Sequence, residues 1–148
     1  MEHEVRLPIT SDADLVPARA QGRALAQALG FSQTDATLIA TAISEIARNI
    51  VVHAGHGEMV MSRVHEPHRY GLVVVAADAG PGIPEIDVAL ERGHTSTGSL
   101  GLGLPGARRL MDDFHVETDP GKGTTVTMTK WRARDELERL RERRRHRV

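Results

Sequence analysis

The sequence predicts an α/β (α+β) two-layer sandwich in which a mixed, mainly antiparallel sheet carries helices on one face. Residues 39–50 repeat isoleucine at helical spacing, which indicates a helix with one buried side. Residues 58–78 and 114–130 each contain two strand-like runs separated by a polar turn. The 148 residues include 40% hydrophobic but only 3% aromatic residues, so we expect one domain with an aliphatic core.

The start of the chain is expected to form one strand and one helix. Residues 5–9 alternate apolar and polar side chains, which predicts a strand. Residues 10–12 offer Thr, Ser and Asp as helix caps. The helix is expected to run to about Leu29, because Gly30 provides a stop.

A second helix is expected from residue 34 or 35 to His53, ending near Gly55. Its apolar positions recur in steps of four, three and four, which places them on one buried side of the helix. These positions are Ile39, Ile43, Ile46 and Ile50.

Two strands are predicted next, over residues 58–64 and 70–78. Residues 66–69 have the composition of the turn between them. The unbroken apolar run at 72–77 predicts that the second strand is buried on both faces.

A long irregular segment is expected from residue 79 to about residue 102, with one short helical turn at 85–91. Segments of this length without regular structure are often functional. A helix is then predicted from residue 103 or 104 to Asp112, with Pro105 in its first turn. The domain is expected to close with strands at 114–118 and 124–130 around a tight turn at 119–123.

The charge is unevenly distributed, although the formal net charge is −1. Residues 131–148 contain eight Arg and four acidic residues, and the preceding residues contain 11 basic and 16 acidic ones. We therefore expect a domain over residues 1–131 and a basic C-terminal tail over 132–148 that is helical or disordered. Acidic residues interleave with the arginines of this tail, so it does not resemble a dedicated nucleic-acid-binding arm.

Composition excludes several function classes. The chain has no cysteine, which rules out disulfides, thiolate zinc sites and cysteine nucleophiles. The apolar run at 72–77 is far shorter than the roughly 20 residues that a membrane-spanning helix needs. The first residues do not resemble a signal peptide. We therefore expect a cytoplasmic location and no membrane partner.

Glu45 and Asn49 are the first candidate site residues. They are four residues apart on the second predicted helix, so they share one side of it, at the shoulder of the isoleucine stripe. An Asn carbonyl oxygen suits Mg²⁺, and a Glu one turn earlier can orient or deprotonate a hydroxyl. Taken alone, the pair is more typical of an ordinary exposed polar surface.

Asp78 ends a predicted strand and opens onto Gly80 and Gly82. A carboxylate there can accept a hydrogen bond from an exocyclic amine, and the glycines allow a flat ligand to approach the backbone. Thr124 can reach the same ligand if its strand is a neighbour. Both segments are also typical of ordinary turns.

The three glycines of residues 98–103 precede a predicted helix. Free N–H groups and the positive end of that helix can face phosphates. The segment matches neither a Walker loop nor a Rossmann fingerprint. The polar run just before it, 95–97, is suited to a lid.

In this order the pieces resemble the four boxes of the gyrase and histidine-kinase (GHKL) ATPase superfamily, which has a Bergerat-type fold. Within it, residues 38–50 and 98–112 closely resemble the small serine-protein kinases of the RsbT type, which control partner switching in bacterial stress responses. Residues 126–131 add to the resemblance, which covers roughly residues 4–131.

The resemblance implies an ATP-dependent serine/threonine protein kinase that uses Mg²⁺. Glu45 is implied as the catalytic base or hydroxyl-orienting carboxylate, Asn49 as the Mg²⁺ ligand, and Asp78 as the residue that holds the adenine amine. The residues expected around ATP are Asn49, His53, Asp78, Gly80, Gly82, Ile83, Thr97, Gly98, Ser99, Leu100, Gly101, Leu102, Gly103 and Thr124.

The resemblance also implies protein partners. The expected substrates are STAS-domain antagonist and scaffold proteins of a stressosome, and the released kinase would activate a PP2C-type phosphatase. Arg19 and Arg23, one turn apart, are expected to dock an acidic partner, although two solvated arginines would have the same pattern. The alternatives are an anti-sigma factor that sequesters a sigma factor, which the run at 101–106 disfavours, and a regulator without catalysis, which Glu45 disfavours.

Overall fold

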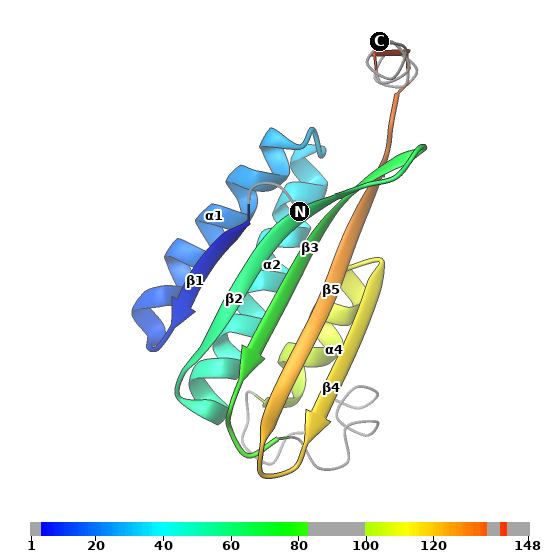
Figure 1. Cartoon of the computed structure of the whole chain (residues 1–148). Coiled ribbons are helices and arrows are strands. Elements are labelled where there is room, and N and C mark those ends of the chain that lie inside the picture. The colour runs from blue at the N-terminus through cyan, green and yellow to red at the C-terminus, as the bar shows by residue number, and fades with distance from the viewer. Residues whose placement is uncertain (1–3, 83–99, 136–139, 142–148) are drawn as a thin grey trace.

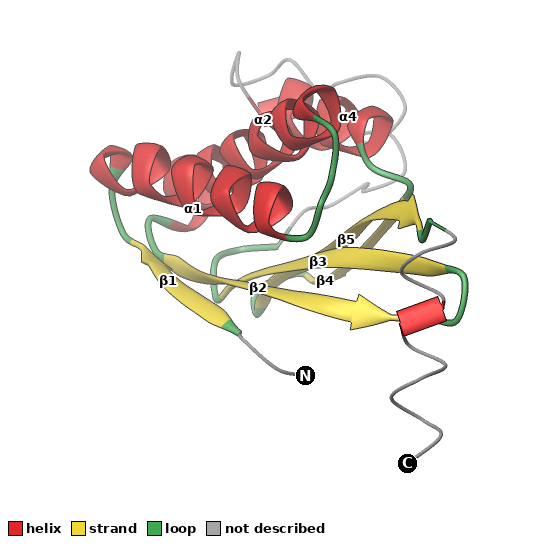
Figure 2. Cartoon of the chain, turned by 90° about the horizontal axis from the view of Figure 1, so that it is seen from above, coloured by secondary structure: helices red, strands yellow, loops and turns green. Residues whose placement is uncertain are grey.

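The computed structural model describes residues 4–82, 100–135 and 140–141. In this part of the chain, a five-stranded sheet has the order β1-β2-β3-β5-β4, and the three longer helices all lie on one of its faces (Figures 1 and 2). The strands are β1 (Val5–Ile9), β2 (Gly57–His65), β3 (Arg69–Asp78), β4 (Asp113–Asp119) and β5 (Gly123–Ala133). The predicted two-layer α/β sandwich is therefore confirmed.

The helices agree with the sequence pattern except at one end. They are α1 (Leu15–Ala28), which follows the 3-10 turn η1 (Asp12–Asp14), α2 (Gln33–Asn49), which continues into the π-helical turn η2 (Ile50–Ala54), and α4 (Leu100–Leu110). The predicted start of the last helix at residue 103 or 104 is wrong, because α4 begins at Leu100. Burial of Leu104 and Ala107 in the core stabilises this helix and outweighs the low helix propensity of its glycines.

Polar side chains start the first two helices, and the sequence predicted such a cap only for the first. Ser11 accepts a hydrogen bond from the Ala13 N–H, and the Asp14 carboxylate accepts one from the Thr10 N–H at 2.7 Å. Hydrogen bonds from Thr10 hold the pKa of Asp14 below its usual value. Ser32 caps α2 by accepting from the Asp35 N–H at 3.0 Å.

All four strand pairings among the described strands are antiparallel. β3 lies at the centre, paired with β2 on one side and with β5 on the other. In this register Asp78, the last residue of β3, lies opposite Gly57 of β2 and Thr124 of β5. The pairing of β3 with β5 therefore brings two predicted site residues, Asp78 and Thr124, together.

The core lies between the helices and the sheet and is aliphatic, as predicted. The whole isoleucine stripe of α2 is buried against the methionines and valines of the sheet, which include Met59, Met61, Val74 and Met128. The predicted burial of 72–77 on both faces is wrong, since Leu72, Val74 and Ala76 are buried while Val73, Val75 and Ala77 are only half-buried. Successive side chains of β3 point to opposite faces of the sheet, and helices cover only one of these faces. The side chains on the other face are therefore less buried.

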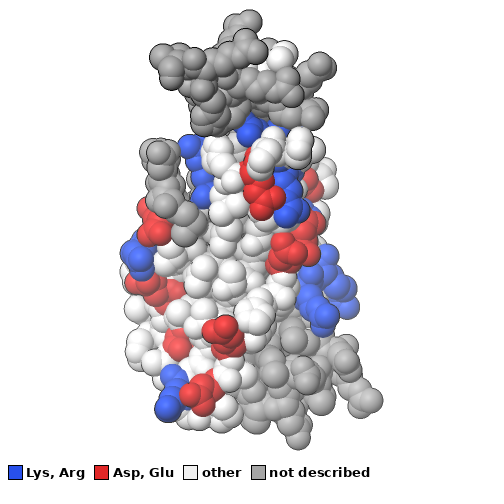
Figure 3. Space-filling model, turned by 45° about the vertical axis from the view of Figure 1, so that its right-hand side comes forward, with Lys and Arg blue, Asp and Glu red and all other residues white. Residues whose placement is uncertain are grey.

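The face drawn in Figure 3 has uncharged side chains along its middle and charged side chains mainly at its margins. No helix in the described part of the chain is long and apolar enough to span a membrane.

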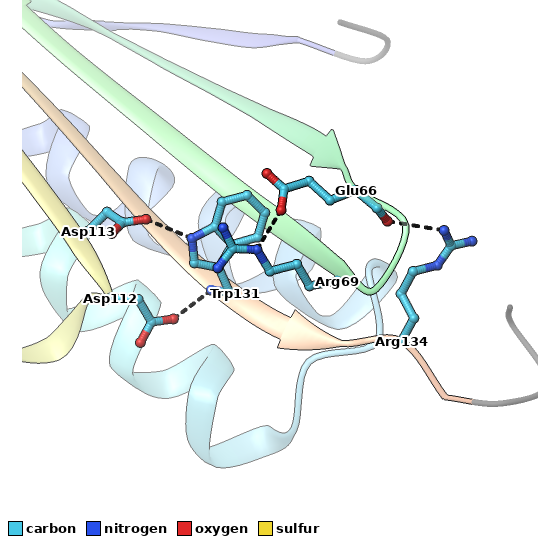
Figure 4. A network of polar contacts seen from close by, with 6 residues as sticks. All are labelled: Glu66, Arg69, Asp112, Asp113, Trp131 and Arg134. Carbon is cyan, nitrogen blue, oxygen red and sulfur yellow. Dashed lines mark hydrogen bonds and ion pairs between the residues drawn. The ribbon is translucent and has the colours of Figure 1, made fainter.

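β5 continues three residues beyond its predicted end at Lys130. Trp131 holds this extension, because its Nε1–H donates to Asp113 and its backbone N–H to Asp112, both at 2.7 Å (Figure 4). The Arg69 guanidinium stacks 3.6 Å from the centre of the indole ring. Arg134 is only 6% exposed and donates to the Glu66 carbonyl at 3.2 Å. The first residues of the expected tail are thus attached to the sheet.

Candidate functional site

A cavity that opens to solvent lies where the C-terminal end of α2 meets the ends of β3 and β5, and its empty space is about 390 Å³ when the adjoining solvent is included. Its polar lining comes from Asn49, His53, Asp78 and Thr124. Its other lining residues are Ile46, Ile50, Ala76, Pro81, Gly82, Leu104 and Val126. A mainly apolar cavity with a few convergent polar groups is typical of a small-molecule site.

The fold brings the polar residues together from four elements, α2, η2, β3 and β5. The ladder between β3 and β5 sets Asp78 beside Thr124, and the buried stripe of α2 seats that helix on the same part of the sheet. Asn49 and His53 then follow one another along α2 and η2 toward the strand ends. Thr124 is buried, and its hydroxyl lies 3.1 Å from that of Thr118.

Asn49 and His53 each present a buried polar atom. Asn49 Nδ2 and His53 Nε2 have no hydrogen-bond partner in the described part of the chain. Burial lowers the pKa of His53, and the nearby Asp78 charge opposes this effect more weakly. Burial therefore favours the neutral imidazole of His53, which has one N–H donor.

Gly80 and Gly82 form the corner beside Asp78. The Asp78 carboxylate accepts a hydrogen bond from the Gly80 N–H at 2.9 Å. A Cβ at Gly80 would lie 2.7 Å from Ala54, and one at Gly82, where φ is +80°, would lie 2.9 Å from the Asp119 carbonyl. In the described structure the small size of these glycines therefore lets η2 and the β4–β5 hairpin approach the strand end closely.

The other predicted site residues have different positions. Glu45 is half-buried on α2, one turn before Asn49, and does not line the cavity. Residues 100–103 form the first turn of α4 rather than a loop. Three parts of the predicted site lie outside the described residues: the expected lid at 95–97, the helical turn at 85–91, and the site residues Ile83, Thr97, Gly98 and Ser99.

The structure also adds site residues that sequence reasoning missed. Ile46, Ile50, Ala76, Pro81, Leu104 and Val126 line the cavity. The isoleucine periodicity had identified two of them, but only as core residues. One side of a core helix forms the cavity wall here, and helical spacing alone does not separate the two roles.

The donor set fits Mg²⁺ only in combination with a ligand. No group of three His, Cys, Asp or Glu side chains able to hold a metal occurs among the described residues. Asn49 places a single amide at the cavity wall. Mg²⁺ is commonly held by one or two protein oxygens together with substrate phosphates and water, and one amide oxygen satisfies that pattern.

Comparison with known proteins identifies the family. Residues 9–130 match the family model of the histidine kinase-like ATPase domain. The chain is 45% identical over 123 residues to the serine/threonine-protein kinase RsbT of Bacillus subtilis (strain 168). The aligned region covers 83% of this chain and 92% of the relative. It is 30% identical over 120 residues to an anti-sigma F factor of Bacillus licheniformis, with 76% and 81% covered.

Solved structures share the fold. The mycobacterial sensor histidine kinase MprB matches with a TM-score of 0.52 and 18% identity, over 88% of this chain and 99% of that chain. The histidine kinase domain of the Erythrobacter litoralis EL346 blue-light activated kinase matches with a TM-score of 0.53 and 21% identity, over 84% and 61%. Together with the sequence matches, this fold shows that the chain belongs to the histidine kinase-like ATPase family and, within it, to the serine/threonine-protein kinases of the RsbT type.

Proposed function

We propose that this kinase transfers the γ-phosphoryl group of ATP to a serine or threonine of STAS-domain antagonist and scaffold proteins in a bacterial stressosome. The observation that carries the nucleotide part of this proposal is the convergence of Asn49, His53, Asp78 and Thr124 on one cavity. The 45% identity to a serine/threonine-protein kinase supports the choice of reaction.

The polar and apolar lining of the cavity supports an adenine site beside Asp78. Asp78 accepts a hydrogen bond from the exocyclic amine of adenine, and Thr124 lies beside Asp78. Apolar side chains of the cavity cover the faces of the ring. The triphosphate then extends toward the start of α4 at Leu100, where backbone N–H groups favour negative charge. Asn49 holds Mg²⁺ through its amide oxygen, and the metal neutralises phosphate charge when bound.

Glu45 is the proposed catalytic residue. Its carboxylate orients the substrate hydroxyl and takes its proton while the hydroxyl oxygen forms a bond to the γ-phosphorus. The bond from that phosphorus to the bridging oxygen breaks, and ADP leaves with the electron pair. Positioning and charge neutralisation supply most of the rate in such transfers.

The proposed biological consequence is a partner switch. A phosphate adds nearly two negative charges, which disrupt docking when they are placed in an interface. The kinase released in this way binds and activates a PP2C-type phosphatase in the cytoplasm. Arg19, exposed on α1, is part of the proposed docking surface for acidic partners.

A second candidate is an anti-sigma factor that sequesters a sigma factor directly. The 30% identity to an anti-sigma F factor favours this alternative. Affinity purification against both a STAS protein and sigma factors distinguishes the two. Capture of a sigma factor without a STAS protein would support the second candidate.

The kinase reaction is tested with labelled ATP, Mg²⁺ and a candidate STAS protein. Glu45→Ala should reduce phosphoryl transfer by about 10²–10⁴-fold, the usual contribution of a general base, and should largely spare nucleotide binding. Glu117→Ala, which removes an exposed carboxylate on β4, is the matched control and should transfer phosphate at the normal rate. Normal transfer by Glu45→Ala would contradict the assigned base.

A further inference from the structure

The cavity contains two buried polar atoms whose partners must come from outside the described protein. Asn49 Nδ2 and His53 Nε2 are both buried in its wall without a hydrogen-bond partner among the described residues. Leaving buried polar groups unpaired is unfavourable, so folded proteins rarely do so unless water or a ligand supplies the missing partner. A ligand with hydrogen-bond acceptors in the cavity would pair with the Asn49 amide N–H and with His53 in its Nε2–H tautomer.

The cavity wall has a defined pattern of donors and acceptors. Asp78 is an acceptor, and burial keeps His53 neutral, so its ring supplies one N–H. The remaining wall beside these two residues is apolar, formed by Ile46, Ile50, Ala76, Leu104 and Val126. A flat, largely apolar ring with one donor group and separate acceptor atoms matches this wall.

Adenine has that pattern. Its exocyclic amine is a donor, and its unsubstituted ring nitrogens are acceptors. Guanine would place its O6 acceptor where adenine has the amine, and an acceptor facing the Asp78 carboxylate is unfavourable. When Asp78 accepts a hydrogen bond from the amine, the ring nitrogens of adenine remain as acceptors that require donors from the protein. His53 can supply one such donor.

We propose that His53 is a second base-reading residue, which donates its Nε2–H to a ring nitrogen of adenine while Asp78 accepts the amine. This inference rests on the proposed function, because it assigns a role in the same nucleotide site. Asp78 then selects for the amine, and His53 adds affinity for the ring without distinguishing whether the amine is present.

The position of His53 is set by η2 and its seat on Gly80. η2 is closed by a hydrogen bond from the Gly55 N–H to the Ile50 carbonyl at 2.9 Å. Ala54, next to His53, lies so close to Gly80 that a Cβ there would be 2.7 Å from the Ala54 Cβ. Any side chain at position 80 would therefore collide with η2 and move it away from the segment that carries Asp78. Gly80 acts as a positioning residue.

The test compares the binding of three probes in the presence of Mg²⁺: ATP, purine riboside triphosphate, which lacks the amine, and tripolyphosphate, which lacks the base. His53→Phe should weaken both nucleotides by about tenfold and leave tripolyphosphate unchanged, because one hydrogen bond to the base is lost. His53→Gln retains an N–H donor and should recover part of the affinity.

Further variants separate the base-reading role from a structural one. Asp78→Ala should abolish the preference for ATP over purine riboside triphosphate, which His53→Phe should preserve. Gly80→Ala should weaken nucleotide binding but not tripolyphosphate binding. Val52→Ala, in the same turn but with Val52 46% exposed, is the control and should bind all three probes normally.

The possible results are distinguishable. Unchanged ATP affinity in His53→Phe, or equal loss for all three probes, would overturn the role of His53 and leave the proposed kinase function in place. Absence of ATP binding by the unsubstituted chain would overturn both proposals.

Discussion

Arg19 and Arg23 lie one turn apart on α1, but their surroundings differ. Arg19 is exposed, whereas Arg23 is half-buried and donates from Nη2 to the Thr37 hydroxyl at 2.9 Å. Thr37 also donates to the Gln33 carbonyl, so this contact links α1 to the first turn of α2. The two arginines that the sequence grouped as a docking patch therefore have separable roles.

Substitution of each arginine tests this difference. Arg19→Glu should weaken binding to the protein substrate by about 1 kcal/mol, mainly through slower association, without lowering stability. Arg23→Leu should lower the free energy of unfolding by about 1 kcal/mol, because the bond to Thr37 is lost. Binding kinetics and denaturant unfolding measure the two effects. A large loss of stability in Arg19→Glu would show that Arg19 is structural as well.

At the scale of elements, β3 and β5 are joined by close packing as well as by their ladder. Trp131 lies over Gly71, its register partner, and a Cβ at Gly71 would be 2.7 Å from the indole ring. The indole cannot easily move aside, because Asp113 and Arg69 hold its edge and its face (Figure 4). The contact between Trp131 and β3 therefore requires a glycine at position 71.

Gly71→Ala should therefore destabilise the protein by about 1–3 kcal/mol, the usual cost of overpacking. The chain has a single tryptophan, so its fluorescence reports directly whether the indole has moved. Gly106→Ala is the matched control, because among the described residues no atom outside its chain neighbours and its own helix backbone lies within 4 Å of the added Cβ. That control should be stabilising by about 0.5–1 kcal/mol, since Gly106 lies inside a helix. An unchanged Gly71→Ala protein would contradict the packing argument.

At the scale of the whole molecule, the C-terminal end of β5 is attached to distant parts of the fold. Trp131, Arg132 and Arg134 all contact residues distant in sequence; Arg132, for example, donates to the Leu29 carbonyl at 2.7 Å. Arg132 and Arg134 also lie 4.7 Å from the Tyr70 ring centre. These contacts tie the end of β5 to the β2–β3 hairpin and to the end of α1.

Two truncations test this boundary. A chain that ends at Asp135 keeps these contacts and should unfold within about 0.5 kcal/mol of the full chain. A chain that ends at Lys130 loses the Trp131 side chain and both arginines, and should be destabilised by about 3 kcal/mol or more. Denaturant unfolding measures both. Equal stability of the two truncated chains would show that the network contributes little.

Much of the fold was accessible from local patterns. The spacing of Ile39, Ile43 and Ile46 predicts α2 because helical burial repeats within a few residues. Two features were not accessible. The start of α4 depends on burial of Leu104 against distant elements, and the extension of β5 depends on Asp112 and Asp113, which act on Trp131 across a strand pair.

The candidate site was likewise predictable from the sequence only in part. The types and order of Glu45, Asn49, Asp78 and Thr124 were enough to predict a nucleotide site, because each group's chemistry belongs to the residue itself. Which of them share one cavity depended on the pairing of β3 with β5 and the seating of α2, contacts between residues far apart in the chain. Helical spacing placed Asn49 at the shoulder of the buried stripe, and the resemblance placed His53 near ATP. The missing hydrogen-bond partners of both residues and the contact of Ala54 with Gly80 are known only from the packed structure.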